Sequence, residues 1–191
     1  SAACPGWGGL IDLLDAMNQV ILDLSAVSGL IHDGMIRGPA WHVMDMGRRI
    51  ERVRDTASLL RSLLVNQTRL ERPVLRALLE VIDCRMTYRS RYMDNVQQNA
   101  VLDLCLTDET CPRSIASQLN ALAEHVDALP GEARSLLRTE ERRVVMSAVH
   151  AVRMIAAEHL EDPATEHILK VLTDLEPQLK LLSDVLTNKY L

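Results

Sequence analysis

The stretch WHVMDMGRRIERVRDTASLL, residues 41–60, predicts a long helix around which we expect the rest of the chain to be arranged. Gly38 and Pro39 precede it, and proline suits the first turn of a helix because the N–H that it lacks would have no partner there. From there to about Val65, nothing except Gly47 interrupts a helix. At 100° per residue one side is apolar, as in a helix packed on a core. That side consists of Val43, Met46, Ile50, Val53, Ala57, Leu60 and Leu64.

The opposite side of this helix is apolar at both ends and charged in the middle. Its residues are Trp41, Asp45, Arg48, Arg52, Asp55, Leu59 and Leu63. We expect other helices to cover this row along its length, so that its charges are at least partly buried and must be paired. If Glu51 is such a buried partner of an arginine, Glu51→Ala should cost about 3–5 kcal/mol. A change within about 0.5 kcal/mol would instead indicate an exposed residue.

The remaining segments also space their apolar residues as helices do, and none alternates with the period of two that is typical of a strand. Phenylalanine is absent and aromatic residues make up 3% of the chain, which favours aliphatic packing between helices. We therefore expect an all-α fold, a bundle of six or seven helices. The expected helices span residues 10–32, 41–66, 73–93, 100–106, 112–129, 139–159 and 162 to the C-terminus, with Pro177 kinking or splitting the last one.

The length of 191 residues and the 48% hydrophobic content suit one domain with an ordinary core. We expect a single helical domain over residues 10–191, preceded by a short remnant or linker at residues 1–9. The chain begins with Ser-Ala-Ala rather than Met and enters a helix almost at once, which suggests a piece of a longer protein.

The formal net charge of −5 argues against a nucleic-acid or membrane-surface partner, since either would need a basic surface. No apolar run approaches the length that spans a bilayer. The cysteines are Cys4, Cys84, Cys105 and Cys111. They form no CxxC pair and follow no secretion signal, so we expect reduced thiols in the cytoplasm. Arginine far outnumbers lysine, which indicates either planar pairing with carboxylates and phosphates or a GC-rich coding bias.

Motifs that would assign a reaction are missing from the sequence. A di-metal centre in a helical bundle needs inward Glu residues and Glu-x-x-His pairs, and no such pair occurs. The sequence also has no Gly-x-Ser-x-Gly nucleophile motif and no phosphate loop. We therefore predict no catalytic residue, no metal and no cofactor, and we interpret His42 as a surface or hydrogen-bonded histidine.

Three charged clusters remain as candidate sites. They comprise Asp45, Arg48, Arg49, Glu51, Arg52 and Asp55; then Tyr88, Arg89, Arg91 and Tyr92; and finally Arg113 with Ser114. The last two residues lie at an expected helix N-terminus, where free backbone N–H groups favour an anion. The clusters could converge to bind a carboxylate or phosphate, or they could pair with one another as a structural network, which we favour.

Three motifs carry a resemblance to a known family. They are Trp41-His42-Val43-Met44-Asp45-Met46-Gly47-Arg48-Arg49-Ile50-Glu51-Arg52, then Tyr88-Arg89-x-Arg91-Tyr92, and Asp108-x-x-x-Pro112-Arg113-Ser114. In their order and spacing they resemble the alpha-E family of bacterial helical domains, whose hallmark is a Gly-Arg-x-x-Glu-Arg helix. The similarity runs from about Leu24 to Leu129 and onward, and the chain looks like the C-terminal portion of the family's full domain. Cys111 departs from the family, which tends to have an aromatic residue before Pro-Arg-Ser.

The resemblance implies a function in amide-bond formation. Members of the family are encoded beside, or fused to, circularly permuted ATP-grasp proteins and transglutaminase-like peptidases. We therefore expect an accessory helical module that docks an ATP-grasp-type amide (peptide) ligase or holds its acidic or peptidic substrate. The alternative is a catalytic or ligand-binding domain with an open anion pocket at Arg48, Glu51, Arg52, Tyr88 and Arg113. A third possibility is a homo-oligomer formed through the Leu-rich C-terminal helix.

Overall fold

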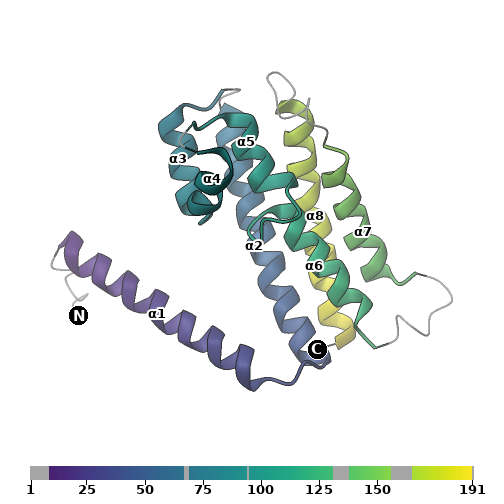
Figure 1. Cartoon of the computed structure of the whole chain (residues 1–191). Coiled ribbons are helices and arrows are strands. Elements are labelled where there is room, and N and C mark those ends of the chain that lie inside the picture. The colour runs from purple at the N-terminus through teal and green to yellow at the C-terminus, as the bar shows by residue number, and fades with distance from the viewer. Residues whose placement is uncertain (1–8, 67–68, 94, 131–137, 156–164, 191) are drawn as a thin grey trace, which may run out of the picture. The chain divides into compact units, whose positions relative to one another are not determined.

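The computed structural model describes residues 9–66, 69–93, 95–130, 138–155 and 165–190, and within them it confirms the all-α prediction (Figure 1). The elements are α1 (Leu10–Gly34), α2 (Pro39–Asn66), α3 (Arg72–Val81), α4 (Arg85–Tyr92), α5 (Gln98–Leu102), the π-helix η1 (Asp103–Thr107), α6 (Ile115–Asp127), α7 (Glu140–Arg153) and α8 (Thr165–Tyr190). None of the helices in the described part of the chain is both long enough and apolar enough to cross a bilayer.

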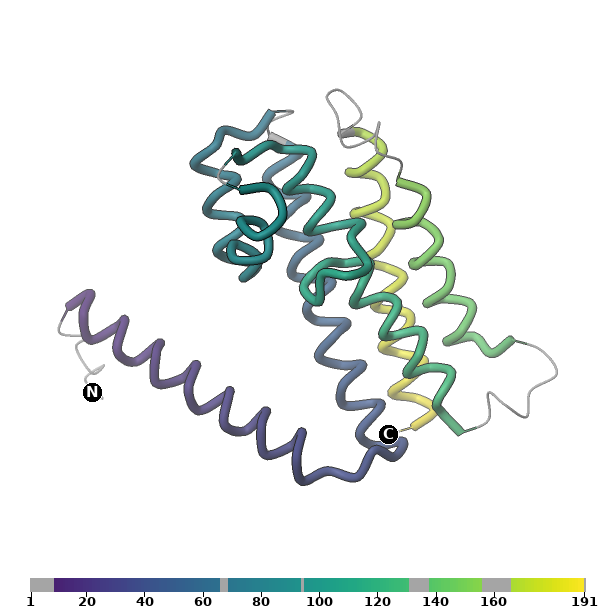
Figure 2. The backbone as a smooth tube through the Cα atoms, in the orientation of Figure 1, coloured from purple at the N-terminus to yellow at the C-terminus, as the bar shows by residue number. Residues whose placement is uncertain are grey.

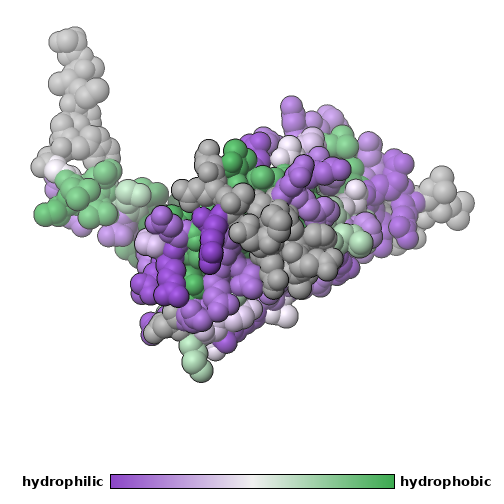
Figure 3. All heavy atoms as spheres, turned by 90° about the horizontal axis from the view of Figure 1, so that it is seen from above, coloured by the Kyte–Doolittle hydropathy of each residue, from purple (hydrophilic) through white to green (hydrophobic). Residues whose placement is uncertain are grey.

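The chain divides into two compact units, Ser1–Trp41 and His42–Leu191. The first unit contains α1, in which no described residue is buried and large apolar side chains are exposed (Figure 3). Its last residue, Trp41, has the Arg37 guanidinium over its ring, 4.1 Å from the centroid. The prediction of a single domain over residues 10–191 stays a prediction. Most of the expected remnant or linker at residues 1–9 lies outside the described residues.

The second unit is built on the apolar side of α2. Of the predicted stripe, all residues but Val43 are buried, and Val43 packs against the core while partly exposed. Hydrogen bonds join Asp45 to His125 and Arg49 to Gln118, so residue numbers rise along α2 as they fall along α6 and the two helices are antiparallel. Contacts between α6 and α7 and between α7 and α8 complete the bundle.

Shorter helices connect α2 to α6. The chain passes from α2 through α3, α4, α5 and η1 before it runs back along α6 (Figure 2). Contacts of α3 with α4 and with α5, and of η1 with α6 and α7, join this segment to the bundle. The short helices therefore place the loop before α6, which carries Arg113, beside the turn between α3 and α4.

The expected helix over residues 73–93 is in fact two helices, α3 and α4, which raises the number of α-helices in the described residues to eight rather than six or seven. The break is at Asp83, whose φ of 59° lies in the left-handed region. Before it, the N–H of Ile82 still bonds to Leu78 O, and after it the N–H of Cys84 bonds to Leu79 O. Left-handed backbone is usually occupied by glycine. Because an aspartate stands there instead, the sequence pattern did not predict the break.

Other boundaries differ from the expectations by smaller amounts. The helix expected at residues 112–129 begins later, at Ile115, and the one at 139–159 is described as α7 up to Arg153, with residues 156–159 outside the described part. Pro177 lies inside α8, which continues from Thr165 to Tyr190 and is therefore not split.

Candidate functional site

The charged middle of α2 divides into an inward and an outward group. Asp45 and Arg49 are partly buried and reach α6. Glu51, Arg52 and Asp55 are exposed. The expectation that neighbouring helices cover the whole row is therefore wrong at Arg52 and Asp55, whereas Arg48 is partly buried.

The inward group is a hydrogen-bonded network centred on Asp45. Its Oδ2 accepts from Arg49 Nε at 2.6 Å and from His125 Nε2 at 2.7 Å. The Nη1 of Arg49 donates to Gln118 Oε1 at 3.2 Å. On the other side of His125, its Nδ1 lies 2.9 Å from the Nδ1 of His42. The network therefore joins α2 to α6: His42, Asp45 and Arg49 come from α2, and Gln118 and His125 come from α6.

The hydrogen bonds assign the proton positions of the two histidines. A carboxylate only accepts, so the Nε2 of His125 carries the hydrogen that Asp45 accepts. In neutral His125 the Nδ1 is then an acceptor, and His42 donates to it through its own Nδ1–H. The two rings meet edge on, with centroids 5.1 Å apart and planes at 62°.

Burial and charge fix the ionisation of this network. Burial lowers the pKa of His125, and this outweighs the opposing effect of Asp45. Burial alone would raise the pKa of Asp45, but Arg49 and His125 outweigh it and hold that pKa below its ordinary value. The folded state thus favours neutral His125 beside ionised Asp45.

His125 and Gln118 were not predicted from the sequence as members of this network. They are spaced seven residues apart on α6 and are both buried within a helix face that is otherwise apolar. A polar pair at this spacing in an apolar stripe was the available signal. The partner on α2 is about 80 residues away in sequence, so local spacing could not identify it.

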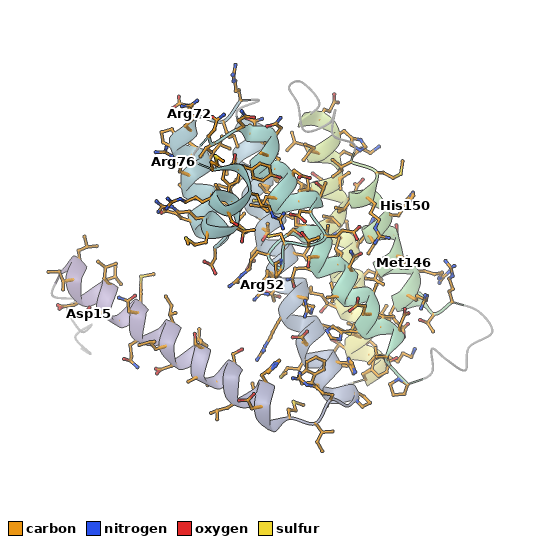
Figure 4. The ribbon with its side chains drawn as sticks, in the orientation of Figure 1. Asp15, Arg52, Arg72, Arg76, Met146 and His150 are labelled. Carbon is orange, nitrogen blue, oxygen red and sulfur yellow. The ribbon has the colours of Figure 1, made fainter. Side chains whose placement is uncertain are left out.

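The outward group is dominated by Arg52, which projects from the middle of α2 (Figure 4). Partial burial lowers the pKa of its guanidinium; the positive charges of Arg113 and Arg49 lower it further, while Asp45 opposes them. In the part of the chain that the structure describes, Arg52 has no ion-pair partner. Arg52 therefore lies in a locally positive environment although the whole chain is acidic.

Glu51 and Arg113 have their own partners near Arg52. Glu51 accepts from Arg54, one turn along α2, and both side chains are about half exposed, at 56% and 51%. Arg113, in the loop before α6, donates to Oδ2 of Asp83 at 2.9 Å, and Asp83 lies in the turn between α3 and α4. The expected strong destabilisation by Glu51→Ala does not apply, because an exposed pair of this kind contributes little.

The second cluster contains both buried and exposed side chains. Tyr88 is buried; its hydroxyl donates to Asn95 O at 2.9 Å and accepts from the N–H of Gln97 at 3.1 Å. Its ring is tilted against that of Tyr92 at 4.9 Å. Arg91 donates to Asp108 and, at 2.8 Å, to Thr110 Oγ1. These residues fasten α4 to the segments that follow it.

The remaining member of the second cluster, Arg89, lines a cavity between α3 and α4. Tyr88 lines the same cavity, but neither Arg52 nor Arg113 does. The open pocket expected to combine Tyr88 with Arg52 and Arg113 is therefore not formed by this cavity.

The third cluster is engaged in holding the loop before α6. The hydroxyl of Ser114 accepts from the N–H of Ser117 at 3.0 Å, as an N-cap, and donates to Asp108 O. Glu109 in the same loop accepts from Arg153 of α7, at 2.6 Å from its Nε. Because Ser114 uses its single donor within the protein, its hydroxyl serves the fold rather than an anion.

Three cysteines are buried together near this loop. The Sγ atoms of Cys84 and Cys111 lie 3.7 Å apart, and Cys105 is hydrogen-bonded to Cys84. The bond from Cys105 lowers the pKa of Cys84 to about 7, burial opposes this, and Cys111 acts in the same direction as Cys105. Cys4 lies outside the described residues. Within those residues, no group of three His, Cys, Asp or Glu side chains is placed to share a metal ion.

Together these features define an all-α protein whose central helix presents a Gly-Arg-x-x-Glu-Arg sequence with an exposed arginine. The chain belongs to the Alpha-E family, described as a predicted alpha-helical domain with a conserved ER motif, and the match covers residues 6–191. The Glu-Arg pair on which the resemblance was based is Glu51-Arg52. That the chain corresponds to the C-terminal portion of the full domain stays a prediction.

The chain is also similar to uncharacterized proteins of Mycobacterium tuberculosis and Mycobacterium bovis. It is 28% identical to each over 181 residues, which are 92% of this chain and 20% of the relative. The chain thus spans about a fifth of the length of these curated relatives. No solved structure matches it at a significant level.

Proposed function

We propose that this chain is a non-catalytic helical module that partners an ATP-grasp-type amide (peptide) ligase in the bacterial cytoplasm. In this proposal its role is to hold an acidic or peptidic substrate, with Arg52 as the contact for a carboxylate or phosphate. The family resemblance supports the ligase as partner. The observation that carries the binding role is the exposed Arg52, which has no acidic partner among the described residues and lies close to further arginines.

The chemistry of Arg52 suits an acidic ligand. A guanidinium group binds a carboxylate or phosphate through two parallel hydrogen bonds. Arg49 and Arg113 are already paired, with Asp45 and Asp83, so they add positive potential without needing to bind the ligand themselves. An incoming anion would relieve the repulsion that lowers the pKa of Arg52.

The expected affinity is low, which suits an accessory role. One hydrogen-bonded charged contact contributes about 1.5–3 kcal/mol. This is less than the roughly 4 kcal/mol that a millimolar complex requires. A module tethered or docked to the ligase would gain the missing affinity through its high effective concentration.

The alternative, a catalytic or ligand-binding domain with an open anion pocket, has less support. Its pocket would combine Arg48, Glu51, Arg52, Tyr88 and Arg113. The Tyr88 hydroxyl is fully engaged with Asn95 and Gln97, and Glu51 is paired with Arg54 on the surface.

NMR titration of the chain with the dipeptide Glu-Glu at low salt, which detects binding weaker than millimolar, tests the proposal. We expect Arg52→Gln to weaken binding about tenfold, which is about 1.4 kcal/mol. Arg61→Gln is the matched control, because it removes the same charge from α2 at a residue whose guanidinium lies 3.8 Å from Glu176; it should leave the affinity within about twofold.

Two results would overturn the proposal. Equal binding by Arg52→Gln and the unaltered chain would remove Arg52 from the site. Amide formation or hydrolysis by the purified chain alone would show that it is itself an enzyme. Co-purification of the chain with an ATP-grasp-type ligase is the expected result for the partner.

A further inference from the structure

A second basic site lies in the cavity between α3 and α4, within the second unit. Its volume is about 250 Å³. The lining residues are Arg76, Leu79, Glu80, Arg85, Tyr88, Arg89, Met93 and Val96. This cavity is separate from the charged middle of α2, and it does not rest on the function proposed for Arg52.

The cavity combines a basic rim with an apolar floor. Leu79, Tyr88 and Val96 are buried and form the floor, and the phenol of Tyr88 is already engaged with Asn95 and Gln97. The polar groups that a ligand meets are therefore the exposed charged side chains of the rim. A concave apolar surface with a few polar groups at its edge is the usual form of a small-molecule site.

The rim is rich in arginine. Three of the lining residues are arginines, and one of them, Arg85, donates from Nη1 to the lining residue Glu80 at 2.6 Å. Arg76 and Arg89 come from different helices, α3 and α4, and both line the cavity. Arginines arranged this way favour an anionic group with planar oxygens.

Met93 lines the cavity and has an unusual backbone conformation. Its φ is 57° and its ψ is −144°, and its side chain is 80% exposed. Such a conformation costs about 1–3 kcal/mol in a residue other than glycine and persists where the surrounding structure enforces it. Here it places an apolar side chain at the mouth of a cavity that otherwise has a charged rim.

We propose that this cavity binds a small anion that carries a carboxylate or phosphate on a compact apolar group. The apolar part occupies the floor at Leu79 and Val96, and the anionic part contacts Arg76 and Arg89. The volume lies just below the range of about 300–1,000 Å³ typical of drug-sized ligand sites, so the ligand is small.

The test compares three probes on the full chain by calorimetry and by methyl NMR. Phenylphosphate and benzoate have both the anion and the apolar group, inorganic phosphate has the anion alone, and benzyl alcohol has the apolar group alone. We expect one of the first two to bind at least about fivefold more tightly than either partial probe, and the better of the two identifies the anion. The Met93, Leu79 and Val96 methyl resonances should shift on binding.

Substitutions locate the site. Arg76→Gln and Arg89→Gln should each weaken binding of the better probe about fivefold to tenfold. Arg72→Gln is the matched control, since Arg72 lies one turn before Arg76 on α3 and does not line the cavity (Figure 4). Met93→Ala should weaken the apolar probe but leave inorganic phosphate unchanged. Far-UV circular dichroism confirms that each variant is folded.

Several outcomes would contradict this proposal. Unchanged binding in both Arg76→Gln and Arg89→Gln would exclude the rim, and equal weakening by Arg72→Gln would show unspecific attraction. Equal affinity for benzyl alcohol would exclude an anion site. Arg52→Gln should have no effect on phenylphosphate or benzoate, so failure of either site leaves the other standing.

Discussion

At the residue scale, two carboxylates on one helix have opposite surroundings. Asp45 is partly buried and accepts from Arg49 and His125, whereas Glu51 is exposed and pairs with Arg54. Removing a charged partner from a desolvated network leaves the other groups unsatisfied, while an exposed ion pair exchanges with water at little cost. The charged side chains of α2 that contribute most to the free energy of unfolding are therefore those on its inward side.

Asp45→Asn should lower the free energy of unfolding by about 1–3 kcal/mol, because Arg49 and His125 lose their charged acceptor. Glu51→Ala should change it by less than about 0.5 kcal/mol. Urea denaturation at pH 7 measures both. Equal losses in the two variants would show that the inward network has no special role.

The His125 side chain should make the stability depend on pH. Burial lowers its pKa in the folded state, while the pKa in the unfolded chain is about 6.5. Below that pH the unfolded chain binds a proton that the folded protein resists, so the free energy of unfolding falls as the pH falls. The charged and titratable groups facing His125 are His42, Asp45 and Arg49, and Asp45 remains ionised in this range.

Denaturation curves between pH 5 and 8 test this dependence. We expect stability to be retained above about pH 6.5 and to decline below it. His125→Gln should flatten the decline, and an identical slope in the variant would assign the titration to another group.

At the element scale, two helices begin with N-cap residues that differ in the number of groups they hold. Ser114 is the N-cap of α6 and is fully buried; its hydroxyl accepts from the N–H of Ser117 and donates to Asp108 O in the preceding loop. Thr139 caps α7 through a longer bond of 3.4 Å from the N–H of Arg142. The first cap therefore fixes both a helix and a loop, and the second fixes only a helix.

Ser114→Ala should cost about 1–2 kcal/mol, since it removes a cap and a buried donor. Thr139→Ala should cost less, about 0.5–1 kcal/mol, because only the weaker cap is lost. Thermal or urea unfolding of both variants compares them. A larger loss in Thr139→Ala would contradict the structural role assigned to Ser114.

The order of the elements and most of the core followed from apolar spacing, because that spacing is local. The buried stripe from Met46 to Leu64 is an example. The break at Asp83 escaped detection because its left-handed backbone is held by hydrogen bonds around the turn rather than by a glycine. The inward network escaped because His125 and Asp45 meet across some 80 residues, and the sequence did not distinguish the inward from the outward charges of α2.

At the scale of the whole molecule, a chain with a net charge of −5 presents Arg52 in a locally positive environment and three arginines around the cavity between α3 and α4. The overall charge repels anions, so specific capture depends on these local groups. In the function proposed above, the acidic group and the enzyme that acts on it belong to other parts of a larger assembly; the curated relatives are about five times longer than this chain.

In the function proposed here, the outward side of α2 binds an acidic group at Arg52 while the inward side stabilises the fold. NMR titration with Glu-Glu, following the Nε–Hε resonances of the arginines, separates these two roles. We expect the largest shift at Arg52, a smaller one at Arg113, and none at Arg61. Shifts confined to other arginines, or no shift at Arg52 at saturating dipeptide, would contradict it.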